Sequence, residues 1–193
     1  MAEAKPAIER TLKFEDSTLS GKVTHDAGGR TRFGIAQKFH PDLPDEFFTG
    51  PAEDALDEAE QIMETDYWDP LRLAEVEDQG VASKLFDMAV NMGTHQAGIY
   101  AQRAVNFQFQ QTGQVLLNPP ATADDLRHPS QVVFPLQEDG RIGPKTIAAI
   151  NAVDPEAYYD LLKQFSAAHY NHIATNNPAQ AVNLAGWLKR AEA

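Results

Sequence analysis

Apolar residues recur at helical spacing near the start of the chain. Ile8 and Leu12 are four positions apart, and Glu15 follows three positions later on the same face. Pro6 suits the first turn of a helix, because its fixed φ fits there and its missing N–H has no partner to lose. A short helix is therefore predicted from residue 6 to Glu15, with an apolar face that ends in a carboxylate.

The next segment, residues 21–35, alternates between apolar and polar positions instead. Val23 lies on the first arm and Phe33 on the second, with Gly28-Gly29 between them as a turn signal. This pattern predicts a small β-hairpin directly after the first helix.

Helices are predicted for most of the remaining chain. The clearest stripe ends at Gly93 and consists of Val81, Leu85, Met88 and Met92. This helix is expected at the centre of the core. Further helices are predicted at about residues 51–66, 95–111, 144–150, 155–174 and 182–190. The first has an apolar face of Ala52, Leu56, Ala59 and Met63, Asp154-Pro155 are the cap and first residue of the fourth, and Val182 and Leu188 lie on the apolar face of the last. The fold class is therefore mainly α with one small hairpin.

One polar stretch interrupts the helices, from Asn118-Pro119-Pro120 to Ser130, and is the best candidate for a linker. It predicts an N-terminal lobe over residues 6–120 and a C-terminal helical lobe over residues 131–191. The later helices carry apolar faces that would not stay exposed, so the two lobes are expected to pack as one compact unit.

Composition narrows the class of protein further. A net charge of −12 without any lysine or arginine cluster argues against a nucleic-acid partner, and a monomer is expected. No apolar run approaches the roughly 20 residues that span a bilayer, and no secretory signal is visible at the start. The absence of cysteine removes disulfides, thiolate catalysis and cysteine metal sites.

The first helix and the hairpin bring together candidate catalytic groups. Glu15 continues an apolar face, where desolvation would raise its pKa as a general acid requires. A hairpin turn after Asp26 could carry that carboxylate and the Thr31 hydroxyl back toward Glu15, which is the two-sided arrangement of a glycosidase. From spacing alone, a surface charge at a helix end and a turn aspartate explain the same residues.

Three ordered motifs resemble a known family. Phe14-Glu15 and residues 26–35 resemble the opening signature of the glycoside hydrolase family 108 muramidases, and residues 85–93 resemble the second motif of that family. Residues 139–146 and 186–190 are similar to the peptidoglycan-binding segment that accompanies this catalytic unit.

The resemblance implies a lysozyme-like helical fold that cleaves the β-1,4 bond between N-acetylmuramic acid and N-acetylglucosamine without a cofactor or metal. Glu15 falls on the catalytic glutamate of the family, and Asp26 and Thr31 fall on the positions that face it. Asp16-Ser17 stand where Gly-Gly is usual, which keeps a non-catalytic peptidoglycan-binding scaffold as an alternative. A lytic transglycosylase is the nearest enzymatic alternative.

Three further residues are candidate substrate contacts. The resemblance suggests that Asn91 contacts the N-acetyl groups of the sugar or orients Glu15, whereas a local capping bond is the simpler reading. Tyr67 and Trp68 could stack on sugar rings or pack in the core. His169 and His172 are three residues apart, but no third ligand motif accompanies them, so no metal site is predicted.

The expected partner is the glycan strand of peptidoglycan. Without a signal peptide, such an enzyme would be made in the cytoplasm and act in the periplasm or cell wall. It would reach the wall through a holin, as a phage or prophage endolysin does, or through a secretion apparatus. The sequence does not choose between these routes.

Overall fold

A computed structural model describes residues 1–15, 19–26, 29–112 and 135–193. The side chains of Glu15 and Asp26, residues Asp16-Ser17, Gly28 of the predicted turn and the predicted linker from Asn118 to Ser130 lie outside the described residues.

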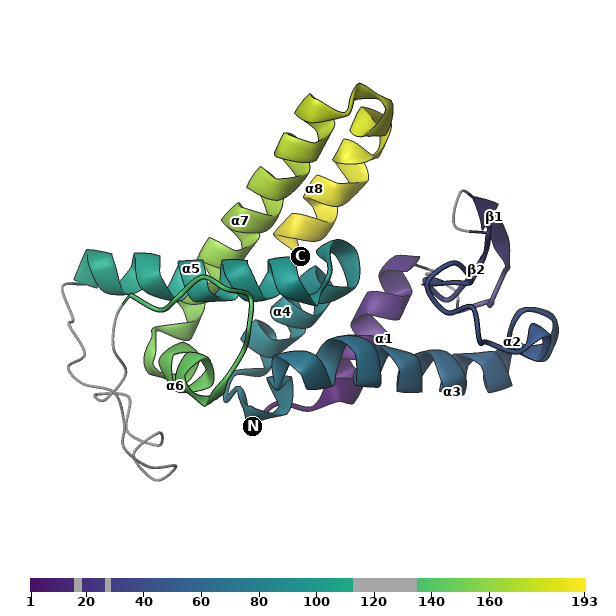
Figure 1. Ribbon diagram of the computed structural model, residues 1–193, viewed down its shortest axis with the longest axis horizontal. Helices are drawn as coiled ribbons and strands as arrows, with labels where there is room; N and C mark the ends of the chain where they lie inside the picture. Colours follow the sequence, from purple (N-terminus) through teal and green to yellow (C-terminus); the bar gives the residue numbers. More distant parts are fainter. Residues whose placement is uncertain (16–18, 27–28, 113–134) are drawn as a thin grey trace.

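Helices dominate the described part of the chain, and the mainly-α prediction with a small sheet is confirmed (Figure 1). The helices are α1 (Ala4–Glu15), α2 (Asp45–Thr49), α3 (Ala52–Met63), α4 (Gln79–Met92), α5 (Thr94–Thr112), α6 (Pro144–Ala152), α7 (Pro155–Asn176) and α8 (Leu184–Glu192). Within the described ranges, none of them is long and apolar enough to cross a bilayer.

Helix α1 begins at Ala4, two residues before the predicted start, and ends at Glu15 as predicted. Ile8 is 3% exposed and Leu12 is 1% exposed. The predicted apolar face is thus the buried face, and it packs against α4. Burial of two such side chains stabilises the helix by about 1.5–3 kcal/mol each.

A three-stranded antiparallel sheet follows α1, in the order β1 (Thr24–Asp26), β2 (Gly29–Arg32) and β3 (Ile35–Ala36). Thr24 pairs with Thr31 and Asp26 pairs with Gly29, so the predicted hairpin is confirmed. The third strand was not predicted. It returns through Gly34, whose φ of 79° is a conformation that glycine adopts without strain.

A buried arginine fastens this sheet to α2. The guanidinium of Arg32 donates to the carbonyl oxygens of Gly21 at 2.8 Å, Phe47 at 2.7 Å and Gly50 at 3.1 Å. Arg32 is only 6% exposed, so these three acceptors compensate for the hydration that the charge gives up.

The helix predicted at residues 51–66 is observed in two pieces. Helix α3 ends at Met63, and a π-helical turn, η1 (Glu64–Trp68), continues the chain. The buried face of α3 is centred on Ala55, Ala59 and Met63. The predicted face consisted of Ala52, Leu56, Ala59 and Met63. Its second half is confirmed, whereas Ala52 and Leu56 are only half-buried and Ala55 is buried instead.

Helix α4 forms the centre of the core, as its sequence pattern predicted. Val81, Leu85 and Met88 are at most 2% exposed. Asp78 caps the helix by accepting a hydrogen bond from the backbone N–H of Val81 at 2.8 Å. Neighbouring helices α1, α5 and α7 all pack against it.

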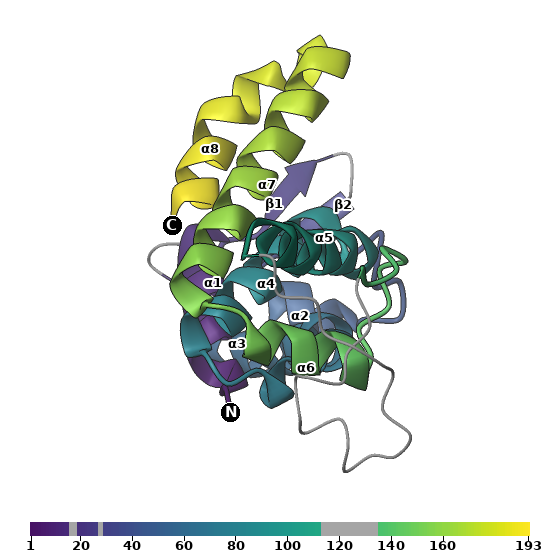
Figure 2. The same ribbon diagram turned by 90° about the vertical axis from the view of Figure 1, so that its left-hand side faces the viewer.

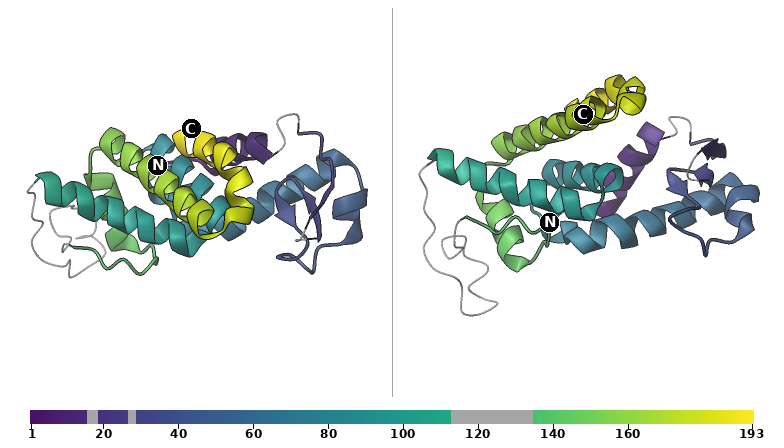
Figure 3. Two further views of the ribbon diagram at one scale, coloured as in Figure 1. Left: turned by 90° about the horizontal axis from the view of Figure 1, so that it is seen from above. Right: turned by 45° about the horizontal axis from the view of Figure 1, so that its top comes forward.

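Helices α7 and α8 form an antiparallel hairpin that projects from the rest of the molecule (Figures 1 and 2). Its base packs beside α4 and α5, and the chain end at α8 returns toward α1, as the views from above and at 45° also show (Figure 3). Asp154 caps α7 through the N–H of Ala157 at 2.8 Å, as the Asp154-Pro155 signal predicted. One hydrophobic core contains both the N-terminal Leu12 and the C-terminal Tyr158 and Leu162.

The prediction for the last helix needs a correction. Val182 was expected on its apolar face, but Val182 is 82% exposed because residues 178–183 form a 3₁₀ turn, η6, before α8 begins at Leu184. Trp187 provides the contact instead, since its ring stacks on Tyr170 with the centroids 5.5 Å apart.

Truncation after Ser130 is expected to give an aggregating or strongly destabilised product. Tyr158 and Leu162 are 0% exposed, and loss of even one such side chain costs about 2–5 kcal/mol. Loss of three helices therefore approaches the whole stability of a domain, about 5–15 kcal/mol. Size-exclusion chromatography and thermal unfolding would measure the outcome.

The control is Val182→Ala, which should change the free energy of unfolding by less than about 0.5 kcal/mol, because the side chain is exposed. A soluble, cooperatively folded and active fragment ending at Ser130 would show that the C-terminal helices are an independent module.

Candidate active site

The three predicted catalytic residues lie on three elements that follow one another along the chain, α1, β1 and β2. Glu15 is the last residue of α1, and Asp26 is the last residue of β1. Their side chains lie outside the described residues, so the structure gives their places along the backbone only. The end of α1 points to the side of the molecule that carries the sheet (Figures 1 and 3).

Thr31 lies in the middle of the sheet, paired with Thr24 on one side and Ala36 on the other. Its hydroxyl oxygen is buried and has no hydrogen-bond partner within the described ranges. A buried hydroxyl in this state is destabilising by about 1–3 kcal/mol. Groups of this kind in native proteins call for an explanation, and a functional role is one.

Two arginines on either side of Thr31 fix its strand. Arg32 binds three carbonyl oxygens, as described above. Arg30 donates to Asp45 at 2.5 Å and to Gln37 at 3.1 Å, and its guanidinium lies 4.4 Å from the centre of the Phe48 ring. The backbone that carries Thr31 is therefore held on both sides, which is what a precisely positioned site requires.

Asn91 lies in the last turn of α4 and is half-buried. Its amide nitrogen donates to the carbonyl oxygen of Asp87 at 2.8 Å and lies 3.5 Å from a carboxylate oxygen of the same residue. This is the local hydrogen bond that the alternative reading expected. A contact between Asn91 and substrate stays a prediction.

The two aromatic candidates differ in exposure. Trp68 is 2% exposed and packs edge-on against Phe86, with the ring centres 5.9 Å apart. Its ring is enclosed by the core and has no face open to a sugar. Tyr67 is half-buried, and burial together with the charge of Asp66 raises the pKa of its hydroxyl. Sugar stacking by Tyr67 stays a prediction.

A buried ion pair joins the C-terminal helix to this region. Nε of Arg190 lies 2.7 Å from a carboxylate oxygen of Asp87, and the two side chains are 11% and 9% exposed. The same guanidinium lies 5.5 Å from the centre of the Phe14 ring. Phe14 directly precedes Glu15, so α8 contacts the last turn of α1. The spacing of 103 residues between the two charges gave no signal in the sequence.

Lys84, about one turn before Asp87 on α4, also contacts α8. It is 1% exposed and donates to the carbonyl oxygens of Arg190 at 3.1 Å and Ala191 at 2.7 Å. Burial lowers the pKa of Lys84 to about 8, although the nearby Asp87 charge acts in the opposite direction. A cation at the carbonyl end of α8 is also favourable for the helix dipole.

His169 and His172 both lie on α7. His169 Nδ1 lies 3.1 Å from the hydroxyl of Tyr100, which connects α7 to α5, and burial lowers the pKa of His169. His172 is exposed, and its backbone carbonyl oxygen accepts a hydrogen bond from the side-chain amide of Asn176 at 2.8 Å. Within the described residues, no group of three or more histidine, cysteine, aspartate or glutamate side chains could hold a metal ion.

A first helix that ends in a glutamate beside a small antiparallel sheet, backed by a helical lobe, defines a lysozyme-like helical protein. Residues 9–93 match the family model described as Glycosyl hydrolase 108, and residues 120–192 match the model of the Predicted Peptidoglycan domain. Residues 9–93 are therefore similar to glycosyl hydrolase 108 and residues 120–192 to a peptidoglycan domain, which confirms the resemblance inferred from the motifs. This combination supports a glycoside hydrolase that acts on peptidoglycan.

One solved structure has the same fold over nearly the whole chain. Brucella abortus SagA aligns with 97% of this chain and 94% of that chain, with a TM-score of 0.58 and 18% sequence identity. Identity this low shows a shared fold only. A comparison with curated protein sequences found no match.

Arg190→Ala is expected to lower the free energy of unfolding by about 3–5 kcal/mol, because it leaves the Asp87 carboxylate buried without its ion-pair partner. Chemical denaturation would measure the change. The matched control is Arg103→Ala, since Arg103 pairs with Glu138 at 2.8 Å but the two side chains are 45% and 31% exposed. An exposed pair contributes only about 0–1 kcal/mol.

Equal losses for the two variants would contradict the role given to the buried pair. Asp87→Asn combined with Arg190→Ala should recover part of the stability, because the uncompensated charge is then removed.

Proposed function

We propose that this protein is an N-acetylmuramidase that hydrolyses the β-1,4 bond between N-acetylmuramic acid and N-acetylglucosamine. Glu15 is the general acid, and Asp26 and Thr31 position the attacking water. The observation that carries the proposal is the match of residues 9–93 to Glycosyl hydrolase 108, because this range contains all three residues on adjoining elements.

The reaction needs one proton donor and one activated water. Glu15, protonated, gives its proton to the glycosidic oxygen as the bond from that oxygen to the anomeric carbon breaks. A water molecule attacks the anomeric carbon from the opposite face and passes its proton to Asp26. The new bond joins the water oxygen to the anomeric carbon and leaves a hydroxyl there as the new reducing end. A water held by Asp26 and Thr31 corresponds to an inverting course.

The surroundings of Thr31 support this role. Its hydroxyl is buried without a partner in the part of the chain that the structure describes, so an ordered water beside it would supply the missing hydrogen bond. Arg30 and Arg32 hold its strand in place, so the hydroxyl would bind that water in one orientation.

Glu15→Gln is expected to lower the rate of reducing-end release from purified sacculi by two or more orders of magnitude, because the amide has no proton to donate. The fold should be unchanged. Glu9→Gln, on the same helix, is the control and should keep the rate of the unmodified protein.

Three outcomes separate the candidate activities. Reducing ends in the products, found by mass spectrometry, support the hydrolase, whereas anhydro-sugar products identify a lytic transglycosylase. Binding to sacculi without any product identifies a scaffold. Near-normal clearance by a stably folded Glu15→Gln variant would show that Glu15 is not the acid.

Asp26→Asn and Thr31→Val should each lower kcat more than they raise KM, with the larger effect at Asp26, since both residues are assigned to the transition state. Valine keeps the shape of threonine and removes only a hydroxyl without a described partner, so the melting temperature should not fall. Thr175→Ala at the end of α7 serves as the control.

If both variants raise KM alone, Asp26 and Thr31 bind substrate, and another group must activate the water.

A further inference from the structure

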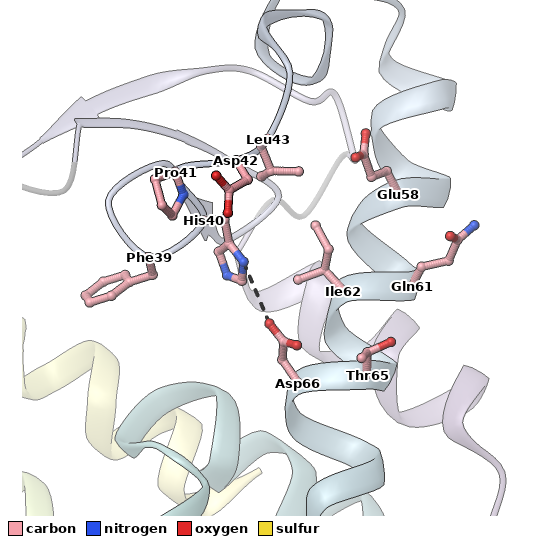
Figure 4. Close-up of a pocket in the computed structure, with 10 residues that line it drawn as sticks. All are labelled: Phe39, His40, Pro41, Asp42, Leu43, Glu58, Gln61, Ile62, Thr65 and Asp66. Carbon is pink, nitrogen blue, oxygen red and sulfur yellow. Dashed lines mark ion pairs between the residues drawn. The ribbon is translucent and has the colours of Figure 1, made fainter.

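A pocket of about 440 Å³ lies between the loop that follows β3 and the helix formed by α3 and η1 (Figure 4). Neither the sequence motifs nor the catalytic proposal assigns it a role. The loop contributes Phe39 and His40, and the helix contributes Gln61, Thr65 and Asp66. Its volume is in the range of small-molecule sites, roughly 300–1,000 Å³.

The polar side of the pocket is rich in hydrogen-bond acceptors. His40 Nδ1 faces a carboxylate oxygen of Asp66 at 3.7 Å, and their side chains are 17% and 44% exposed (Figure 4). Asp42 and Glu58 add two carboxylates, and the described lining includes neither lysine nor arginine. These charges disfavour an anionic ligand. Carboxylates do accept hydrogen bonds from hydroxyl groups, and a neutral polyhydroxylated ligand supplies many of them.

The apolar side presents an aromatic ring to solvent. Phe39 is 73% exposed, the largest value among the described aromatic side chains that are exposed. In Figure 4 its ring extends away from the helix that carries Gln61 and Ile62. A large exposed ring beside a polar pocket is typical of a binding surface, and its flat face suits the C–H face of a pyranose.

The helix wall is irregular at this pocket. Thr65 and Asp66 lie in the π-helical turn η1, which follows the regular helix α3. Single π-helical turns are rare and occur frequently at functional sites. This turn places Asp66 opposite His40, and two residues later it places Trp68 in the core. The π-helical turn and the exposed Phe39 ring are thus two separate features of this pocket that are typical of binding sites.

The pocket is connected to the catalytic sheet by a short, bonded segment. Ala36 of β3 pairs with Thr31, and the N–H of Phe39 donates to the carbonyl oxygen of Ala36 at 3.0 Å. Three residues span at most roughly 10 Å. The pocket therefore lies close to Thr31, within reach of the same glycan strand.

We infer that this pocket is a saccharide subsite, in which one N-acetylglucosamine of the glycan strand, the sugar without a carboxylate, stacks on Phe39 and bonds through its hydroxyl or N-acetyl groups to His40 and Asp66. The identity of the ligand rests on the proposed function. Phe39 is then a substrate-positioning residue that acts away from the bond being cleaved.

Binding is measured in the Glu15→Gln background, so that the glycan stays intact, by calorimetry with soluble glycan strands freed of stem peptides by an amidase. Adding Phe39→Ala should weaken binding about tenfold, which corresponds to the loss of one ring–sugar contact. Phe39→Trp should restore it. Phe107→Ala, which removes a 43% exposed ring from α5, is the control and should leave affinity unchanged.

With Glu15 intact, Phe39→Ala should raise KM about tenfold and leave kcat unchanged, in contrast to Thr31→Val. Equal affinities for the Phe39→Ala and Phe107→Ala variants would overturn the subsite while leaving the muramidase assignment intact. A loss seen with strands that keep their stem peptides, but not with stripped strands, would identify a peptide-binding pocket and overturn it too. Weakened binding to stripped strands supports the subsite even if Glu15 proves not to be the acid.

Discussion

The architecture depends on the burial of charged groups from α4 against the last turn of α8. Asp87 pairs with Arg190, and Lys84 donates to two carbonyl oxygens of α8. Removing one partner from such a pair leaves an uncompensated charge, which costs about 3–5 kcal/mol. The C-terminal helix therefore has one favourable position on the N-terminal lobe, and in that position Arg190 also contacts Phe14, the residue before Glu15. A segment matched to a peptidoglycan domain thus contacts the last turn of the helix that ends at Glu15.

A second buried arginine stabilises the sheet on the other side of the candidate site. Arg32 is buried without a carboxylate and is satisfied by three backbone carbonyl oxygens, which fasten β2 to the chain on either side of it. Carbonyl oxygens belong to the backbone, so these three bonds fix the guanidinium relative to the chain itself. Arg32 therefore stabilises the sheet, and Arg190 contacts the last turn of α1. The groups proposed to act on either side of the glycosidic bond belong to these two elements.

Features set by local spacing could be predicted from the sequence. The stripes in α1 and α4, the cap at Asp154 and the hairpin follow from helical or alternating periodicity, and each is confirmed. Features set by contacts between residues far apart in the sequence could not be predicted. Periodicity places Val182 on an apolar face and leaves Trp68 between sugar stacking and core packing, and only the tertiary packing exposes the first and encloses the second. The Asp87–Arg190 pair joins positions 103 residues apart, and the turn η1 has no sequence signal of its own. The candidate catalytic residues came from motif resemblance, since carboxylates are common throughout this chain.

Thr31 shows how such a site differs from the rest of the core. Its buried hydroxyl lacks a partner in the described residues, which costs about 1–3 kcal/mol, while a valine would fill nearly the same space without that cost. Arg30 and Arg32 prevent the strand from shifting to relieve the unmet bond, so the hydroxyl stays directed at a fixed point. In the proposed mechanism this arrangement is preorganisation, because the hydroxyl would gain its missing hydrogen bond only when the attacking water binds.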